Sequence, residues 1–248
     1  MDIKKVYEKG TVTKYLVKGT NASFMNTIRR TVMTKVPCLA VDQIQIYEND
    51  SVVFDEMLAN RLGLLPIKTD VKGYKKGDTV KLVLEKTGPG MVTSKDIKCT
   101  DPKIEIIDKK IPITKLGKEQ NIKIEMTAVM NTGAEHARFQ PAIVSYNEII
   151  EIINDKSYDT KAILSEVPKG AMEVKAGKLF FADPYNTEQQ NQPLDILRKH
   201  GVKFEYSKTD FVLTIDSTGQ MNPKEVLEGA IDQLILNLDE FEEHIKKL

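Results

Sequence analysis

The sequence predicts an α+β protein that has a β-rich insertion and closes on a long helix. Two observations predict this class. Apolar and polar residues alternate over several short segments, which is typical of strands with one face in water. Near both ends of the sequence, apolar residues instead recur three and four positions apart, as they do on amphipathic helices. The apolar fraction of 41% and the charged fraction of 29% in 248 residues are those of an ordinary globular protein.

The expected strands share the alternating pattern and are separated by turn residues such as Gly, Pro, Asn and Asp. They are TKYLVKG (13–19), LAVDQIQIYEN (39–49), DTVKLVLEKTG (78–88), KIEIID (103–108), NIKIEMTAVM (121–130) and VKFEYSKTDFVLTID (202–216). AMEVKAGKLFFADP (171–184) is expected to form a hairpin. The segment from about residue 70 to 145 is therefore β-rich and is expected to be a compact insertion.

Two shorter helices are expected in the first quarter of the chain. Thr20 or Asn21 can cap a helix that runs to about Val36, where Pro37 ends it. A second helix is expected over 54–62, because Gly63 suits the position that follows a helix. Another short helix, LDILRKHG (194–201), precedes the final strand.

The segment after Asn222 is the longest expected helix. Asn222 suits the N-cap, Pro223 the first helical position and Glu225 the third. Apolar residues then recur at alternating spacings of four and three, which is a heptad repeat: Leu227, Ile231, Leu234, Leu238, Phe241, Ile245 and Leu248. This face packs either on the chain's own sheet or, along one edge, on a partner chain. A length of about 39 Å, at about 1.5 Å per residue, favours the partner.

The first helix carries adjacent arginines on an apolar surface. Its apolar residues form one row of Phe24, Ile28, Val32 and Val36 and a neighbouring row of Met25 and Met33. Arg29 lies between these rows, and a lone buried charge is costly. Arg29 therefore either reaches solvent at the edge of the core or, together with Arg30, presents guanidinium donors to another protein chain.

Charge and reactive residues argue against several function classes. Lys+Arg and Asp+Glu are 36 each, so no net field attracts the chain to DNA. Cys38 and Cys99 lie far apart without a C-x-x-C motif, which favours a reducing compartment and no cysteine metal site. The histidines, His136, His200 and His244, lack metal-binding spacing. No segment reaches the roughly 20 apolar residues of a membrane span, and the N-terminus lacks a signal sequence, so a cytoplasmic protein is expected.

Three blocks of the sequence resemble the family of D subunits of archaeal RNA polymerase, which is related to the bacterial alpha subunit and the eukaryotic third-largest subunit. The blocks are FMNTIRRTVMTKVPCLAVDQIQIYEN with FDEMLANRLGLLPI, then EHARFQPA, and finally FVLTIDSTGQMNPKEVLEGAIDQLILNL. They stand in the family's order and cover about a third of the chain. Chance agreement of all three in order is improbable.

The resemblance implies a division into three parts. A split dimerisation domain, a mixed sheet with helices that include the long C-terminal one, would comprise 1–47 and 206–248. A β-rich insertion domain would span 48–148, and a degenerate ferredoxin-like module 149–205. In the family, the dimerisation domain pairs with the small subunit L. The pair then collects the small subunits N and P and the two large catalytic subunits, so DNA is reached only through the complex.

The resemblance also implies a function without catalytic residues: an assembly platform of DNA-directed RNA polymerase. Candidate contacts to the large and small subunits are Asn26, Arg29, Arg30, Glu56 and Arg61. The implied heterodimer helix uses Leu227, Ile231, Leu234, Leu238, Phe241 and Ile245. Glu56 could equally complement the positive end of its own helix. The alternative function is a self-dimerising scaffold or regulatory binding module outside polymerase.

Many members of the family carry an iron–sulfur module that this sequence has lost. Aligning the pattern C-x₂-C-x₂-C-x₃-C-P on Pro168 places Ser157, Thr160, Ile163 and Val167 at the ligand positions. The second cysteine run, aligned on Pro184, places Thr187, Gln190, Pro193 and Leu197 there. Iron–sulfur clusters are held by thiolates, and neither cysteine lies in this segment. A form without iron–sulfur cysteines, metal or cofactor is expected; alternatively, the segment is unrelated to ferredoxins.

Overall fold

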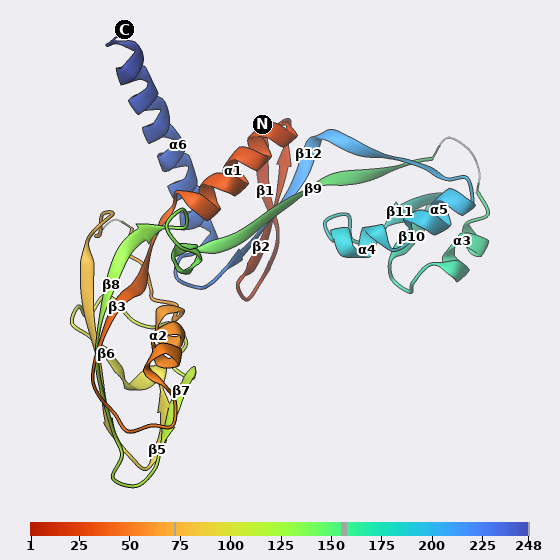
Figure 1. Cartoon of the computed structure of the whole chain (residues 1–248). Coiled ribbons are helices and arrows are strands. Elements are labelled where there is room, and N and C mark those ends of the chain that lie inside the picture. The colour runs from red at the N-terminus through yellow and green to blue at the C-terminus, as the bar shows by residue number, and fades with distance from the viewer. Residues whose placement is uncertain (72, 155–157, 248) are drawn as a thin grey trace. The chain divides into compact units, whose positions relative to one another are not determined.

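In the computed structural model, residues 1–71, 73–154 and 158–247 are described, and they form two compact units. Unit 1 comprises Met1–Thr27 and Ser145–Ile215, and unit 2 comprises Ile28–Val144 and Asp216–Leu248. Both units combine antiparallel strands with helices (Figure 1), so the predicted α+β class is confirmed.

Unit 1 contains a four-stranded sheet and a small helical module. The sheet has the order β1-β2-β12-β9. Its strands are β1 (Asp2–Lys9), β2 (Val12–Lys18), β12 (Lys203–Ser217) and β9 (Ala142–Ile153). The module surrounds the hairpin of β10 (Met172–Lys175) and β11 (Lys178–Phe181) with α3 (Thr160–Glu166), α4 (Thr187–Asn191) and α5 (Leu194–Lys199). The predicted hairpin is thus confirmed.

Unit 2 contains a larger sheet of order β3-β8-β4-β6. Its strands are β3 (Pro37–Asn49), β8 (Asn121–Thr132), β4 (Thr79–Thr87) and β6 (Ile97–Cys99). A two-stranded sheet joins β5 (Gly90–Thr93) to β7 (Pro112–Leu116), and α2 (Asp55–Gly63) lies beside the strands (Figure 1). Leu58 and Leu62 of α2 are fully buried in one apolar cluster with Leu82 and Ile124 of the sheet. This cluster explains why the short helix forms at all.

Strand β3 contains two irregularities in its pairing. Its register against β8 shifts between Val41 and Gln43 and again between Ile46 and Glu48. A bulge moves the following side chains to the other face of a sheet. Val41 is out of step with the alternation of Ile44 and Ile46. Because of the shift after Val41, all three side chains nevertheless face the same apolar cluster, with Val41 fully buried and the two isoleucines partly buried.

The two longer helices begin with the capping chemistry that the sequence predicts. Helix α1 (Ala22–Thr34) is capped by Asn21, whose Oδ1 accepts a hydrogen bond from the Phe24 N–H at 2.9 Å. It ends before Val36, because a residue preceding proline disfavours helical backbone. Helix α6 (Pro223–Ile245) has a capping box in which Glu225 accepts from the Asn222 N–H at 2.9 Å.

One predicted strand is wrong. KIEIID (103–108) forms only an isolated bridge between Ile106 and Ile67. Asp101 accepts a hydrogen bond from the Lys103 N–H, and Asp108 accepts one from the Lys110 N–H, each at 2.8 Å. These aspartate turns bend the backbone at both ends of the segment. Its alternation instead reflects the burial of isoleucines in the core of unit 2.

The structure adds strands at β1, β5, β6, β7 and β9 that the sequence interpretation did not assign. The predicted domain boundaries at 47/48, 148/149 and 205/206 fall inside β3, β9 and β12. The three-part division stays a prediction.

Candidate interaction surfaces

The apolar seam of α6 is the largest candidate binding surface. We define the seam as Leu227, Ile231, Leu234, Leu238, Phe241 and Ile245. Leu238 and Phe241 are 66% and 65% exposed, and Ile231 and Ile245 are about half exposed. Only Leu227 and Leu234 are partly buried, and Leu248 lies outside the described residues. Large apolar side chains in a continuous exposed row mark an interaction surface.

The first turns of α6 are fixed on unit 2 by a different face of the helix. Val226 and Ala230 are fully buried. A Cβ on Gly229 would lie 3.3 Å from Cγ1 of Val36, so the helix packs closely on the chain that follows α1. Further along, Lys35 donates to Oδ1 of Asn237 at 2.9 Å. These contacts hold α6 to its domain while its seam stays open.

The predicted contact residues on α1 are partly exposed. Arg29 is half-buried, and its NH1 lies 3.8 Å from the sulfur of Met33. Asn26 is also half-buried, whereas Arg30 is exposed. Arg29 therefore sits at the edge of the apolar surface, which is compatible with both of the roles that the sequence left open, and Arg30 is exposed. Their roles as contacts stay predictions.

The predicted contact residues on α2 differ from each other. Glu56 is exposed in the first turn of the helix. Arg61 donates from NH1 to the carbonyl oxygen of Ile113 at 2.8 Å, which ties α2 to β7. Arg61 thus has a structural partner within the unit, and a contact with another chain must use its remaining donors.

The sequence interpretation missed a second exposed apolar group around α2. It comprises Val52, Phe54, Met57 and Leu64, each more than half exposed. The sequence does indicate this group, because positions 54, 57 and 64 form a second apolar row on the helix, beside the row of the buried Leu58 and Leu62. Counting both rows would have indicated a helix with two apolar sides.

The loop EHARFQPA is an anchor. Arg138 donates from NH1 to the Val41 carbonyl oxygen at 2.9 Å, and its Nε lies 3.2 Å from Nδ1 of His136. The same guanidinium lies over Gly63, where a Cβ would be only 3.3 Å from NH1. Arg138 thus joins β3 to the end of α2.

Cys38 is a buried structural thiol. Its Sγ lies 3.0 Å from Oε1 of Gln220, and Thr69 is close by at 3.4 Å. Burial raises the pKa of the Cys38 thiol to about 11. A neutral, enclosed thiol is a poor nucleophile, so Cys38 serves here as a small buried residue.

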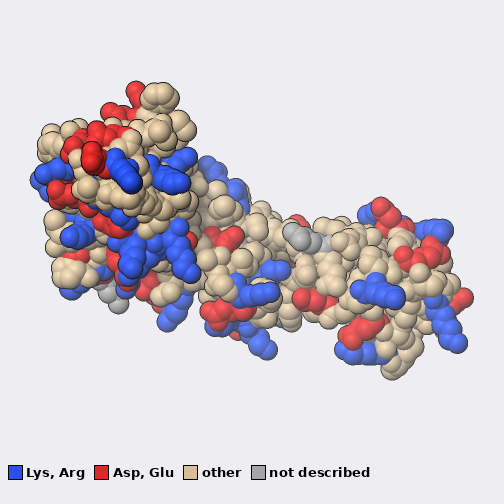
Figure 2. Space-filling view, turned by 90° about the horizontal axis from the view of Figure 1, so that it is seen from below, with Lys and Arg blue, Asp and Glu red and all other residues tan. Residues whose placement is uncertain are grey.

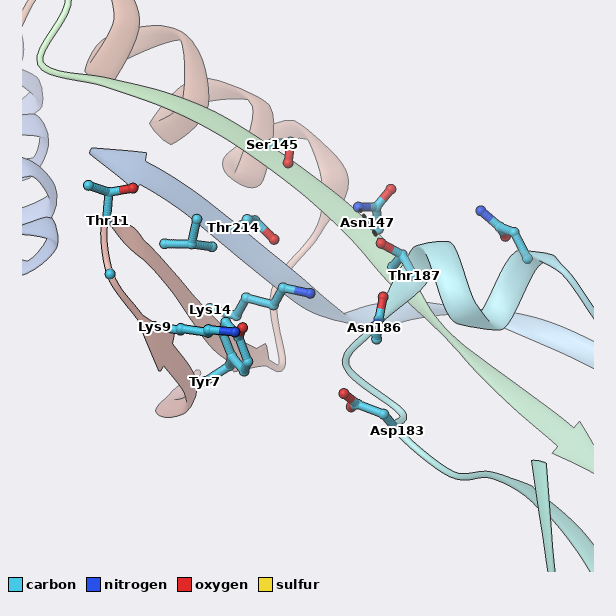
Figure 3. Close-up of a pocket in the computed structure, with 13 residues that line it drawn as sticks. Tyr7, Lys9, Thr11, Lys14, Ser145, Asn147, Asp183, Asn186, Thr187 and Thr214 are labelled. Carbon is cyan, nitrogen blue, oxygen red and sulfur yellow. Dashed lines mark hydrogen bonds between the residues drawn. The ribbon is translucent and has the colours of Figure 1, made fainter. Parts of the chain in front are cut away.

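Unit 1 contains a cavity of ≈ 840 Å³ lined by the β1–β2 hairpin, by β9 and β12 and by the loop before α4 (Figure 3). Several of its polar side chains form hydrogen bonds within unit 1. Lys14 donates to the Tyr185 carbonyl oxygen at 3.3 Å, Asn147 donates to Thr187 at 3.4 Å, and Asp183 accepts from the Tyr185 N–H at 2.9 Å. Two of these hydrogen bonds tie strands β2 and β9 to the segment at the start of α4.

The residues at the aligned iron–sulfur positions do not fit a cluster. Ile163 and Leu197 are fully buried, and Val167 is nearly so, in the apolar core of the small module. Ser157 lies outside the described residues. Among the residues that the structure describes, no group of three or more His, Cys, Asp or Glu side chains is placed to hold a metal ion.

No helix within residues 1–71, 73–154 and 158–247 is long and apolar enough to cross a membrane.

Both basic and acidic side chains occur throughout the face drawn in Figure 2. Nucleic-acid backbones are bound mainly by accumulated Lys and Arg, whereas the prominent surfaces here are an exposed apolar seam and a second apolar group. An exposed apolar row of this kind is typical of proteins that dock other chains.

Comparison with known proteins gives the family. Residues 42–158 match the family described as RNA polymerase Rpb3/RpoA insert domain. Curated relatives called DNA-directed RNA polymerase subunit Rpo3 match nearly the whole chain. The protein of Pyrococcus furiosus is 29% identical over 100% of this chain and 98% of its own length. The protein of Methanopyrus kandleri is 30% identical over 97% and 94%, and that of Halobacterium salinarum 31% over 99% and 97%. The chain belongs to the Rpo3 family, which is the family of archaeal D subunits.

Proposed function

We propose that this chain is an assembly subunit of DNA-directed RNA polymerase and is not catalytic itself. Family membership across nearly the full length supports this role. The observation that carries it is the exposed seam of α6 on a helix whose base is fixed in unit 2. A long apolar surface that its own domain leaves uncovered is suited to a permanent partner, because obligate interfaces are rich in apolar area.

The seam is proposed as the site of heterodimerisation with the small subunit L. The small subunits N and P and the two large catalytic subunits are proposed as later partners of the pair. For those later contacts, Asn26, Arg29, Arg30, Glu56 and Arg61 are the proposed residues. Arg30 and Glu56 are the most accessible of them. The complex is proposed to work in the cytoplasm, with DNA reached only through the large subunits.

The small module is proposed to be a ferredoxin-like fold without a cluster. The aliphatic side chains at the aligned ligand positions support this proposal, since they fill the core of the module. The chain's two cysteines, Cys38 and Cys99, both lie outside residues 149–205. A purified sample without absorbance near about 400 nm, the region of iron–sulfur charge transfer, would agree with it. Recovery of stoichiometric iron would contradict it.

The experiment that tests the proposed function is affinity purification of the tagged full chain from its native cells. Recovery of both large polymerase subunits with a small partner in equal amounts is expected. Leu234→Asp with Leu238→Asp should abolish recovery of the small partner, because two charges would be desolvated in the seam. Leu236→Asp is the matched control, since this exposed leucine lies on the opposite side of the same helix. Recovery of the chain alone as a homodimer would favour the scaffold function instead.

A further inference from the structure

The cavity of unit 1 is lined almost wholly by polar side chains. Of the described residues that line its ≈ 840 Å³, only Gly10 and Val12 lack a hydroxyl, amide, ammonium or carboxylate group. All of the lining residues belong to unit 1. Pockets for apolar ligands are lined predominantly by hydrophobic and aromatic side chains. The lining of this cavity instead suits a small ligand that is itself polar.

Two ammonium groups line the cavity from the β1–β2 hairpin. Lys9 ends β1, and Lys14 lies on β2. Nζ of Lys14 lies 5.5 Å from the centre of the Tyr7 ring and donates to the Tyr185 carbonyl oxygen at 3.3 Å, so this side chain is held in place. Among the residues that the structure describes, neither lysine forms an ion pair with a carboxylate. An ammonium group has three donors, so both lysines can still donate to an anion.

The third charged group of the lining is the carboxylate of Asp183. It comes from the loop before α4, whereas the lysines come from the hairpin (Figure 3). Its Oδ1 accepts from the Tyr185 N–H at 2.9 Å, and its second oxygen can accept from a ligand. Dinucleotide-binding proteins use a carboxylate to bind ribose hydroxyls. A ligand that is anionic along its whole length would be repelled by Asp183, whereas a ligand with hydroxyl groups at one end would not.

Hydrogen bonds between its walls preform the cavity. The contact of Lys14 with the Tyr185 carbonyl oxygen joins β2 to the loop before α4. Asn147 of β9 donates to Oγ1 of Thr187 at 3.4 Å, at the start of α4. A ligand that enters a preformed cavity does not have to order its walls, and avoiding that cost increases affinity. The polar groups of the lining are therefore already in place for a ligand.

We propose that this cavity binds a small phosphorylated compound that also carries hydroxyl groups, either a sugar phosphate or a nucleotide. Lys9 and Lys14 bind the phosphate, because charge-assisted hydrogen bonds from ammonium groups to phosphate oxygens are short and strong. Asp183 accepts hydrogen bonds from the hydroxyl groups of the ligand. The site adds ligand binding to the assembly role and does not depend on it.

A strand of nucleic acid fits the cavity less well than a small phosphate compound. Nucleic-acid backbones are bound by several Lys and Arg side chains that follow the strand. Lys9 and Lys14 are the only basic residues among the described residues of the lining, and Asp183 lies in the same cavity. Outside it, basic and acidic side chains are mixed over the face drawn in Figure 2. The charges thus match one phosphate group better than a chain of them.

The experiment is isothermal titration calorimetry of the full-length chain at constant ionic strength. The probes are inorganic phosphate, ribose 5-phosphate and ATP, with a single-stranded oligonucleotide as a fourth arm. Lys9→Gln, alone and together with Lys14→Gln, removes the ammonium groups. Lys4→Gln with Lys208→Gln is the matched control, because both are exposed lysines of the same sheet outside the cavity.

A further variant, Asp183→Asn, removes the charge of the carboxylate but keeps an oxygen that can accept from the Tyr185 N–H. Circular dichroism would confirm that each variant is folded. Lys9→Gln alone keeps the test decisive if loss of the contact between Lys14 and Tyr185 unfolds the chain, because no hydrogen bond or ion pair of the Lys9 side chain is found among the described residues.

Ribose 5-phosphate is expected to bind at one saturable site and more tightly than inorganic phosphate. Lys9→Gln should weaken its binding at least about threefold and the double lysine variant at least about tenfold, whereas the control should bind as wild type does. Asp183→Asn should narrow the preference for ribose 5-phosphate over phosphate. Tighter binding of ATP than of ribose 5-phosphate would identify a nucleotide as the ligand, and the reverse order would identify a sugar phosphate.

The absence of saturable binding of all three small probes up to about 10 mM would overturn the proposal. Equal binding by wild type and the folded lysine variants would also overturn it, since the phosphate would then lie elsewhere. Binding of the oligonucleotide without binding of the small probes would show that the chain binds a nucleic-acid strand instead.

Discussion

Helices α1 and α6 carry the same kind of apolar repeat, but the two repeats have opposite fates. In α1 and the residues after it, Ile28, Val32 and Val36 are buried in unit 2. In α6, most of the seam is exposed, and the helix is anchored through Val226 and Ala230 on another face. The comparison shows that apolar periodicity identifies a helix and its apolar side, whereas the identity of what covers that side depends on the rest of the assembly.

The largest difference between the two helices should appear when a charge is placed on each apolar face. Val32→Asp should lower the free energy of unfolding by about 4 kcal/mol or more, because Val32 is fully buried and an aspartate there has no cation partner. Urea denaturation measures the loss. Val32→Ala is the control for lost volume and should cost less. A loss of under about 1 kcal/mol would mean that this face of α1 is not covered.

A smaller effect is expected at Cys38, the second residue of β3, whose thiol contacts Gln220 just before α6. Its pKa is raised from 9.0 to about 11 by burial, so the fold favours the neutral thiol. The corresponding stability is present below pH 9 and is lost as pH rises toward about 11. It amounts to about 2–3 kcal/mol from the linkage relation.

The measurement is the free energy of unfolding as a function of pH for wild type and Cys38→Ala. Wild type should fall more steeply across the alkaline range, since tyrosines and lysines titrate in both proteins. Parallel curves would show that the thiol ionises freely in the folded state.

The cap of α6 should matter less, because it stabilises only the anchored base of the helix. Asn222→Ala is expected to lower the free energy of unfolding by about 1 kcal/mol. Thermal or urea unfolding measures it, with Glu240→Ala as a control on the exposed part of the same helix. No change on removing Asn222 would indicate that the Glu225 half of the capping box is sufficient.

The smallest effect on stability is expected at the seam itself. Leu238→Asp should change the free energy of unfolding of the isolated chain by less than about 0.5 kcal/mol, because the side chain is already exposed. It should at the same time reduce nonspecific aggregation, measured by light scattering. A loss of several kcal/mol would show that α6 folds back onto its own domain, and the contrast with α1 would disappear.

Much of this fold could be predicted because local patterns agree with it. Asn21, Asn222 and Pro223 mark helix starts by their capping chemistry, and Pro37 marks a stop. The alternation in β4 and β8 also follows directly from one buried face. These features depend on neighbours within a few residues, so a single sequence carries them.

The failures depend on contacts that are distant in sequence. Strand β1 is exposed on nearly all its residues and shows no alternation; it exists through its pairing with β2. The isoleucines of 103–108 alternate because they fill the core of unit 2, between two aspartate turns. Among the site residues, Arg61 was predicted as an outward contact, and its hydrogen bond to Ile113 could not be inferred without knowing where β7 lies.

The strand order β1-β2-β12-β9 also has a consequence for how the protein is made. Lys18 ends β2 and Lys203 begins β12, so the ribosome must synthesise everything between them before the sheet can close. The strands of the unit 2 sheet, in contrast, are all complete once Thr132 has emerged. Domains generally fold as they are synthesised, and long-range strand pairing is slow. The unit 2 sheet is therefore expected to fold first on the ribosome, and the N-terminal hairpin is expected to pair with β12 only later.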